Sequence, residues 1–288
     1  MRRGPSGPRI FSIGANMQAA LVSMLHLDSA QISDCGRVRN HNEDSIGSFT
    51  PESEIESRTR GWLFALADGV GGQDAGEVAS RTAVEALLEG FRAAPAGEPH
   101  SALLRRLIQS ANTRIYEAGH SGAKRVAMAT TLVACSLRFN RAAVAHVGDS
   151  RCYLIRGGAA ESLTRDHTVV NDQMRLGVLS AKEASESAAK HVLSRSLGND
   201  MFVSVEIAEH QVLAGDVLLL CSDGLHGPVP EHDLAEIVRR HQDLNEAARR
   251  LVEVANERDG GDNVSIQLVR VHSVERIGMY RGRPYKLA

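Results

Sequence analysis

The sequence has 288 residues and a formal net charge of −2, with 43% hydrophobic and 24% charged residues. These values are typical of a globular protein, and the charge gives no electrostatic reason to expect nucleic acid or an anionic membrane as the main partner. Aromatic residues make up only 4%, which argues against a surface for stacking nucleic-acid bases. No apolar stretch approaches the roughly 18 residues that a membrane span requires, so we expect none.

The cysteines lie far apart and form no CxxC pair: Cys35, Cys135, Cys152 and Cys221. Three of them lie inside apolar runs, where cysteine usually serves as a small buried hydrophobe. This usage favours a reducing cytoplasm over a disulfide framework, and we expect cytoplasmic localisation. Residues 1–24 lack the continuous apolar core of a signal peptide, and we expect a flexible extension there.

The first half of the chain predicts strands followed by a pair of helices. Strands are expected at His26–Ser33 and at the apolar run Trp62–Ala67. A helix is expected to begin near Asp74, since Asp74 and Glu77 have the spacing of a capping box. A second helix is expected at about Ser101–Ala118, where apolar residues recur at helical spacing.

The middle of the chain is rich in β-prone residues, and its end repeats the order of strand, helix pair and strand. Strands are expected at Ala129–Leu137, Ala142–Val147, Arg151–Ile155, Val217–Cys221 and Val264–Val271, and helices at Asp233–Arg240 and Glu246–Arg258. The polar segment 166–198 is weakly helical, as in a surface flap, and the basic tail 273–288 is expected to be a solvated, partly disordered end. Grouped strands with paired helices predict an α+β fold with largely antiparallel sheets.

Two apolar runs end abruptly on an acidic residue and a glycine, Asp68-Gly69 and Asp223-Gly224. For either one alone, a tight turn is the commoner explanation. Further carboxylates lie at other expected strand ends: Glu43, Asp44, Asp149 and Asp262. If the strands pack side by side, these six carboxylates can converge at one edge of the sheets.

Carboxylates gathered in partial burial repel one another, and a divalent cation held by oxygen ligands is the usual remedy. Without supporting His or Cys ligands, such a set favours Mg²⁺ or Mn²⁺ over Zn²⁺. The glycines after Asp68 and Asp223 allow the backbone to turn closely past an ion. Arg39 lies beside the first acidic pair and suits bidentate phosphate binding, with a surface ion pair to Glu43 as the alternative.

Taken together, these motifs resemble those of the PP2C (PPM) family of metal-dependent protein serine/threonine phosphatases, in its compact bacterial form. In order, they are Arg39-Asn-His-Asn-Glu-Asp44, Ala67-Asp-Gly-Val-Gly-Gly72, Ala129-Thr-Thr-Leu132, Gly148-Asp-Ser-Arg151, Ser222-Asp-Gly-Leu225 and Asp262-Asn-Val264. The resemblance implies a phosphatase domain over residues 25–272, with a flap at about 166–198. It also implies a four-layer αββα sandwich, in which a helix pair covers the outer face of each of two antiparallel sheets.

The resemblance further implies two Mn²⁺ or Mg²⁺ ions between the sheets. Asp68 would bridge the two ions, with the Gly69 carbonyl on one of them, and Asp223 and Asp262 would bind the other. A water bridging the two cations would lose a proton near neutral pH and attack phosphorus in line.

The remaining implied roles concern the edge of this centre. Glu43 and Asp44 would hold the metals largely through water, and Arg39 would grip the substrate phosphate. Asp149, together with Asp223, matches a third metal site, for which a turn carboxylate is the open alternative.

The chain departs from the family pattern after Asp68-Gly69, where Val70 and Gln73 replace a Met and a His that many bacterial members carry. The acid that protonates the leaving group is therefore unassigned, with water and His41 as candidates. The other histidines near the motifs lack metal-ligand spacing in the sequence and are predicted to be structural: His146, His167 and His226.

The implied partners are phosphorylated proteins, and a cognate Ser/Thr kinase with its targets is a reasonable hypothesis. We expect a monomer. A phosphatase-like binding protein without activity is one alternative, but no metal-bridging carboxylate is lost. A carboxylate-metal nuclease is another, which the near-neutral charge and the lack of a basic groove disfavour.

Overall fold

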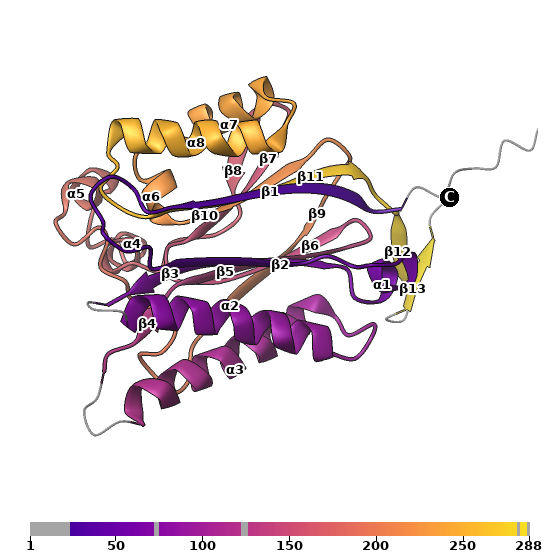
Figure 1. Ribbon diagram of the computed structural model, residues 1–288, viewed down its shortest axis with the longest axis horizontal. Helices are drawn as coiled ribbons and strands as arrows, with labels where there is room; N and C mark the ends of the chain where they lie inside the picture. The colour runs from indigo at the N-terminus through magenta and orange to yellow at the C-terminus, as the bar shows by residue number, and fades with distance from the viewer. Residues whose placement is uncertain (1–23, 72–74, 122–125, 281–282, 287–288) are drawn as a thin grey trace, which may run out of the picture.

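The computed structural model describes residues 24–71, 75–121, 126–280 and 283–286. They form two antiparallel sheets packed face to face, with helices on both outer faces (Figure 1). The predicted four-layer αββα sandwich is therefore confirmed. No described helix combines the length and the apolar character that crossing a membrane would require.

The first sheet has the order β2-β3-β5-β6-β9 and is covered by two helices. Its strands are β2 (Asp44–Phe49), β3 (Trp62–Val70), β5 (Leu132–Arg138), β6 (Arg141–Val147) and β9 (Glu206–Gln211), and the two-residue β4 (Ala129–Thr130) pairs with β3. The helices are α2 (Ala75–Ala93) and α3 (His100–His120). Each presents one apolar face to the sheet, which follows from the helical spacing of their buried residues.

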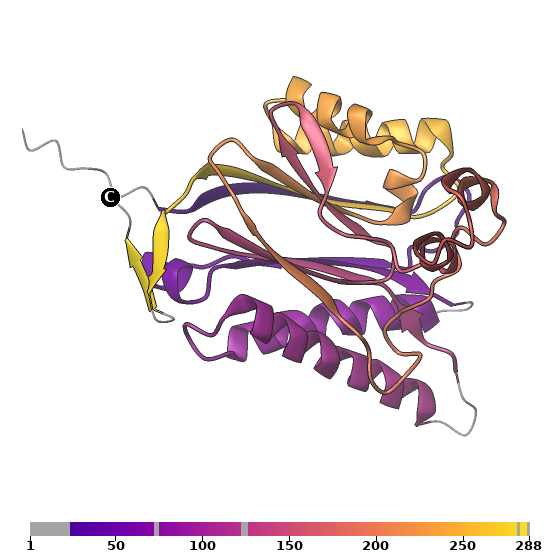
Figure 2. The same ribbon diagram turned by 180° about the vertical axis from the view of Figure 1, so that it is seen from behind.

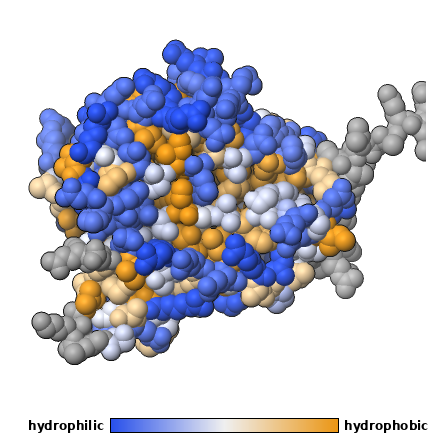
Figure 3. All heavy atoms as spheres, in the orientation of Figure 1, coloured by the Kyte–Doolittle hydropathy of each residue, from blue (hydrophilic) through white to orange (hydrophobic). Residues whose placement is uncertain are grey.

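The second sheet has the order β1-β11-β10-β7-β8 and lies beneath the other helix pair. Its strands are β1 (His26–Asp34), β11 (Val264–Ser273), β10 (Val217–Cys221), β7 (Arg151–Arg156) and β8 (Ala159–Ser162), and its helices are α7 (Glu231–Arg240) and α8 (Leu244–Arg258). The apolar faces of these helices pack on the sheet, and their outward surface is mostly hydrophilic (Figure 3).

The inner faces of the two sheets enclose a third apolar cluster, to which both sheets contribute. Cys135 of β5 and Cys152 of β7 are fully buried in it, and Cys221 is fully buried on β10. All four cysteines are free thiols. This confirms the prediction that three of them are small buried hydrophobes without disulfides.

The flap, residues 166–198, contains two short helices, α4 (Val169–Arg175) and α5 (Ala181–Glu186). It lies at the same end of the sandwich as the short helix α6 (Asp223–His226), which follows β10 (Figures 1 and 2). The weak helical character expected for this segment is confirmed.

Two predictions of local structure were wrong. Asp68-Gly69 is not a turn, because β3 continues to Val70 and pairs with β2 and β4 on its two sides. Asp223 begins α6 rather than a turn. The tail also has regular structure, since β12 (Ile277–Tyr280) and β13 (Arg283–Lys286) form an antiparallel hairpin at the opposite end, near α1 (Glu54–Thr59) (Figure 1).

Candidate metal centre

The predicted acidic residues lie together at one end of the sandwich. One cleft of about 710 Å³ is lined by Arg39, Glu43, Asp68, Gly69, Asp149, Asp223 and Asp262. Asp44 does not line this cleft but lies directly opposite Asp68 in the β2–β3 ladder. Strands from both sheets thus end where their carboxylates face the same space, as the motif order predicted.

One carboxylate oxygen of Asp44 is hydrogen-bonded, and the other has no described partner. Its Oδ2 accepts a hydrogen bond from the Ser222 hydroxyl at 2.9 Å. Its Oδ1 is buried and has no hydrogen-bond partner among the described residues. Burial raises the pKa of Asp44 to about 7, and the negative charges of Asp223 and Asp262 add to the effect. A buried carboxylate with a free oxygen is suited to a cation or to water bound to one.

The other central carboxylates feel the same repulsion. Burial raises the pKa of Asp68 well above its usual range, and the nearby charges of Asp44 and Asp223 raise it further. Burial also raises the pKa of Asp149 to about 7, with Asp223 as the main neighbouring charge. The arrangement is costly without positive charge between the carboxylates, so the residues present fit divalent cations.

Asp223 differs from these neighbours because it has a basic partner. Burial acts to raise its pKa, but the facing His191 and the nearby His226 outweigh burial and lower it. The His191 Nδ1 lies 3.6 Å from the Asp223 Oδ2. His191 lines the cleft, whereas His41 is exposed and is not among the described lining residues. The sequence pattern therefore did not single out His191 as a residue of the cleft.

The two glycines after the aspartates are needed for close backbone approach. A Cβ on Gly69 would lie 2.4 Å from the backbone of Gly76 and 2.6 Å from the Glu43 carbonyl oxygen. A Cβ on Gly224 would lie 2.0 Å from the carbonyl oxygen of Asn263. Each Asp-Gly pair thus joins its strand end to a neighbouring segment of the acidic cluster.

Replacing Gly224 by alanine is expected to lower the free energy of unfolding by about 3 kcal/mol, because backbone must move to admit the methyl group. Urea denaturation measures this, and calorimetry should show weaker Mn²⁺ binding. Gly157→Ala is the control: its added Cβ meets nothing within 4 Å, so only backbone strain applies and Mn²⁺ binding should not change. Equal Mn²⁺ affinity in the two variants would contradict the role assigned to Gly224.

Arg39 is exposed at the rim of the cleft and is paired with a different acid from the one anticipated. Its Nη2 lies 2.8 Å from the Asp262 Oδ2, and no ion pair with Glu43 occurs between these described side chains. Its guanidinium therefore lies directly beside a predicted metal ligand, where it could donate to an oxygen of a phosphate bound at a cation there.

Several polar residues that the sequence did not single out hold the cluster together. Asn263 accepts a hydrogen bond from the Glu43 N–H at 2.8 Å and donates to the carbonyls of Cys35 and His41 at 3.0 Å. The Thr131 hydroxyl accepts from the Asp68 N–H at 2.9 Å. Their motifs, Asp262-Asn-Val264 and Ala129-Thr-Thr-Leu132, were the available signal, but backbone support cannot be deduced from spacing.

Two histidines predicted to be structural approach each other closely. His146, His167 and Glu206 place ligand-type atoms within 4.8 Å of one another. However, the two rings are stacked at an interplanar angle of 14°, so their in-plane lone pairs do not converge. The His167 Nδ1 accepts from the Gly148 N–H at 3.2 Å, next to Asp149. These contacts favour a structural role at the base of the flap.

Gly72 of the second motif, the following Gln73 and the expected helix cap Asp74 lie outside the described residues. Val70, the other departure from the family pattern, is exposed and lines the cleft.

Comparison with known proteins gives a consistent result. Residues 37–270 match the sequence profile of the family described as Protein phosphatase 2C. The chain is 36% identical over 254 residues to the serine/threonine phosphatase Stp of Listeria innocua, covering 87% of this chain and 96% of the relative.

Solved structures agree. The fold matches the Mycobacterium tuberculosis serine/threonine phosphatase PstP/Ppp with a TM-score of 0.76 at 33% identity, covering 86% of this chain and 100% of the other. It also matches the catalytic domain of PstP crystallised in complex with two manganese ions, with a TM-score of 0.74 at 34% identity over the same shares of the two chains. With the matching sheets and the ordered acidic motifs, these similarities show that the chain belongs to the protein phosphatase 2C family and is a protein serine/threonine phosphatase of that type.

Proposed function

We propose that the acidic cleft holds two Mn²⁺ or Mg²⁺ ions and hydrolyses phosphoserine and phosphothreonine in proteins. The ligands would be Asp68, the Gly69 carbonyl, Asp223 and Asp262, with Glu43 and Asp44 acting largely through water and Asp149 serving a third ion. The observation that carries the proposal is the buried, mutually repelling set of carboxylates in one cleft. The two manganese ions of the PstP catalytic domain, a structural neighbour, support it.

When bound, the divalent ions supply positive charge that activates a water for attack and offsets charge on the phosphoryl oxygens. The chain's own residues provide the geometry. Asp68 lies between the two sheets, where the Thr131 hydroxyl fixes its backbone. Arg39 lies at the rim, where its planar fork can bind the substrate phosphate and orient it for in-line attack.

Replacing Arg39 by alanine is expected to lower kcat/KM for a phosphothreonine peptide by roughly 10- to 100-fold, mainly through KM, because a charged hydrogen bond to phosphate is lost. Steady-state kinetics measure this. Arg37→Ala removes an exposed arginine from the same loop and should leave kcat/KM unchanged. If Arg39→Ala left KM unaltered, Arg39 would not bind the substrate phosphate, and its only role would be the ion pair with Asp262.

The physiological substrates are proposed to be proteins phosphorylated on Ser or Thr, including a cognate kinase of the same organism and its targets. We further propose that residues 25–272 form the phosphatase domain, that the chain acts as a monomer, and that it works in the cytoplasm. The free thiols support a reducing compartment.

Val192 and Leu193 of the flap line the cleft, which supports a part for the flap in substrate choice.

The direct test is hydrolysis of a phosphothreonine peptide by EDTA-treated protein, before and after Mn²⁺ is added. We expect turnover only with Mn²⁺. Turnover without any divalent ion would sink the two-metal proposal. Stoichiometric Mn²⁺ binding without turnover would favour the alternative of a phosphatase-like binding protein.

A further inference from the structure

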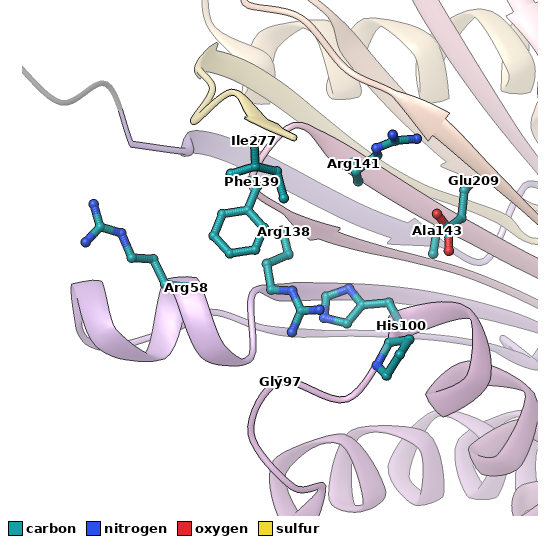
Figure 4. Close-up of a pocket in the computed structure, with 10 residues that line it drawn as sticks. Arg58, Gly97, His100, Arg138, Phe139, Arg141, Ala143, Glu209 and Ile277 are labelled. Atoms are coloured by element: carbon teal, nitrogen blue, oxygen red, sulfur yellow. The ribbon is translucent and has the colours of Figure 1, made fainter. Parts of the chain in front are cut away.

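A second cavity lies at the end of the sandwich opposite the acidic cleft. It has a volume of about 310 Å³ and is lined by Arg58, Gly97, Pro99, His100, Arg138, Phe139, Arg141, Ala143, Glu209 and Ile277. Its walls come from α1, the start of α3, the β5–β6 turn, β9 and the tail strand β12 (Figure 4). A cavity of this size suits a small molecule.

The centre of this cavity is a cation without an acidic partner. The Arg138 Nη1 donates to the Thr59 carbonyl at 3.0 Å, and its guanidinium carbon lies 5.6 Å from the centroid of the Phe139 ring. Among the described residues, no carboxylate oxygen forms an ion pair with it within 4.0 Å. Burial lowers the pKa of Arg138, and Glu209 offsets this only in part. A half-buried guanidinium without a paired anion is electrostatically costly.

The neighbouring His100 does not offset the unpaired positive charge of Arg138. His100 points toward Arg138 in Figure 4, and its Nε2 lies 2.8 Å from the Arg60 carbonyl oxygen, to which it can donate. Burial, together with the charge of Arg138, lowers the pKa of His100 to about 4, so the ring is neutral at pH 7.

The lining charges leave an excess of positive charge. Arg58 is neutralised by Glu275, whose Oε2 lies 3.1 Å from its Nε. Of the lining residues, Glu209 is the sole acid, whereas the lining arginines other than Arg58 are Arg138 and the exposed Arg141. A bound group with one negative charge would neutralise the excess positive charge of the lining.

The remaining wall is apolar, and it includes a residue with a strained backbone conformation. Pro99, Phe139, Ala143 and Ile277 supply apolar surface. Phe139 has a backbone φ of 60°, a left-handed conformation that is strained for a bulky residue. Glycine would fit this turn more cheaply, yet the phenylalanine ring lies where it covers Arg138.

We propose that this cavity binds a small organic carboxylate with an aromatic or branched apolar body. The carboxylate binds the guanidinium of Arg138, with Arg141 at the entrance, and the apolar body packs against Phe139 and Ile277. Such a ligand supplies both the charge and the apolar contact that the cavity lacks. Because β12 of the tail hairpin forms one wall, the ligand also ties the tail to the phosphatase fold.

The proposal is tested with the full-length protein by ligand-observed fluorine NMR, using 4-(trifluoromethyl)benzoate and its uncharged amide. We expect saturable binding of the benzoate and at least about tenfold weaker binding of the amide. Arg138→Met should weaken benzoate binding by at least about tenfold. Arg250→Met, which removes an exposed arginine from α8, should leave it unchanged.

If Arg138→Met does not fold, Arg141→Glu decides the question, since Arg141 is exposed and charge reversal there should also abolish binding. Equal affinity for benzoate and amide, or unchanged binding in the arginine variants, would overturn the proposal, as would no binding of the benzoate. The readout is independent of phosphatase turnover, so the outcome is separate from that of the proposed function.

Discussion

Asp68→Asn is expected to lower kcat for a phosphothreonine peptide by at least about a thousandfold. Asp68 lies at the centre of the acidic cleft, opposite Asp44 and between the two sheets. An amide there cannot neutralise two cations, and the several kcal/mol of charge stabilisation that they give the reaction would be lost. Steady-state hydrolysis with saturating Mn²⁺ measures the effect.

The matched control is Asp28→Asn. Asp28 is exposed at the other end of β1, where its Oδ2 lies 2.6 Å from the His272 Nε2. The Asp28→Asn variant should keep full activity. The Asp68 variant should also remain folded, because asparagine occupies the same volume and relieves charge repulsion. A folded Asp68→Asn protein with normal kcat would show that Asp68 is not part of the reaction centre.

Metal removal is expected to make stability depend on pH. In the unfolded chain, aspartates titrate near pH 3.9. In the folded protein without metal, the pKa values of Asp44 and Asp149 are about 7. Between pH 4 and 7 these two aspartates thus bind more protons in the folded state than in the unfolded state, so their contribution to the free energy of unfolding falls as pH rises through this window.

The size of this effect follows from the shifts. One aspartate shifted from 3.8 to about 7 corresponds to a loss on the order of 4 kcal/mol. Buried histidines act in the opposite direction with or without metal, because the lowered pKa values of His100, His167 and His226, each about 4, make stability rise with pH. The aspartates are therefore isolated by the difference in melting temperature between Mn²⁺-bound and EDTA-treated protein, which should widen by about 10 °C between pH 5 and pH 8. Calorimetry measures this difference, and a difference that stays constant or narrows over this range would contradict the account.

Much of the fold could be predicted because the strongest signals are local. Helical spacing of apolar residues predicted α2, α3, α7 and α8, and apolar runs predicted β3 and β10. The missed strands β2, β8 and β9 have mostly partly exposed or exposed positions. They therefore lack the continuous apolar runs on which the predictions depended.

The site was predictable in its acidic residues but not in its supporting contacts. Carboxylates after apolar strands predict convergence at a sheet edge, and Asp68, Asp149, Asp223 and Asp262 do line one cleft. The pairing of Arg39 with Asp262 joins residues 223 positions apart, which local spacing cannot specify.

The glycines show the same limit. Asp-Gly is typical of turns, and the sequence could not distinguish a turn from a strand that needs close backbone approach. Gly69 lies inside β3 against Gly76, and Gly224 lies inside α6 against Asn263. Only the tertiary arrangement reveals why a side chain is excluded at either position.

The central claim is that the acidic cleft holds divalent ions, and Mn²⁺ calorimetry combined with metal analysis tests it most directly. EDTA-treated wild-type protein and Asp28→Asn should bind at least two Mn²⁺ per chain. Asp68→Asn, which removes the carboxylate proposed to hold both ions, should bind fewer than two with much lower affinity. Two ions bound with unchanged affinity in the Asp68 variant, or no Mn²⁺ bound by the wild-type protein, would contradict the assignment of this cleft as the metal centre.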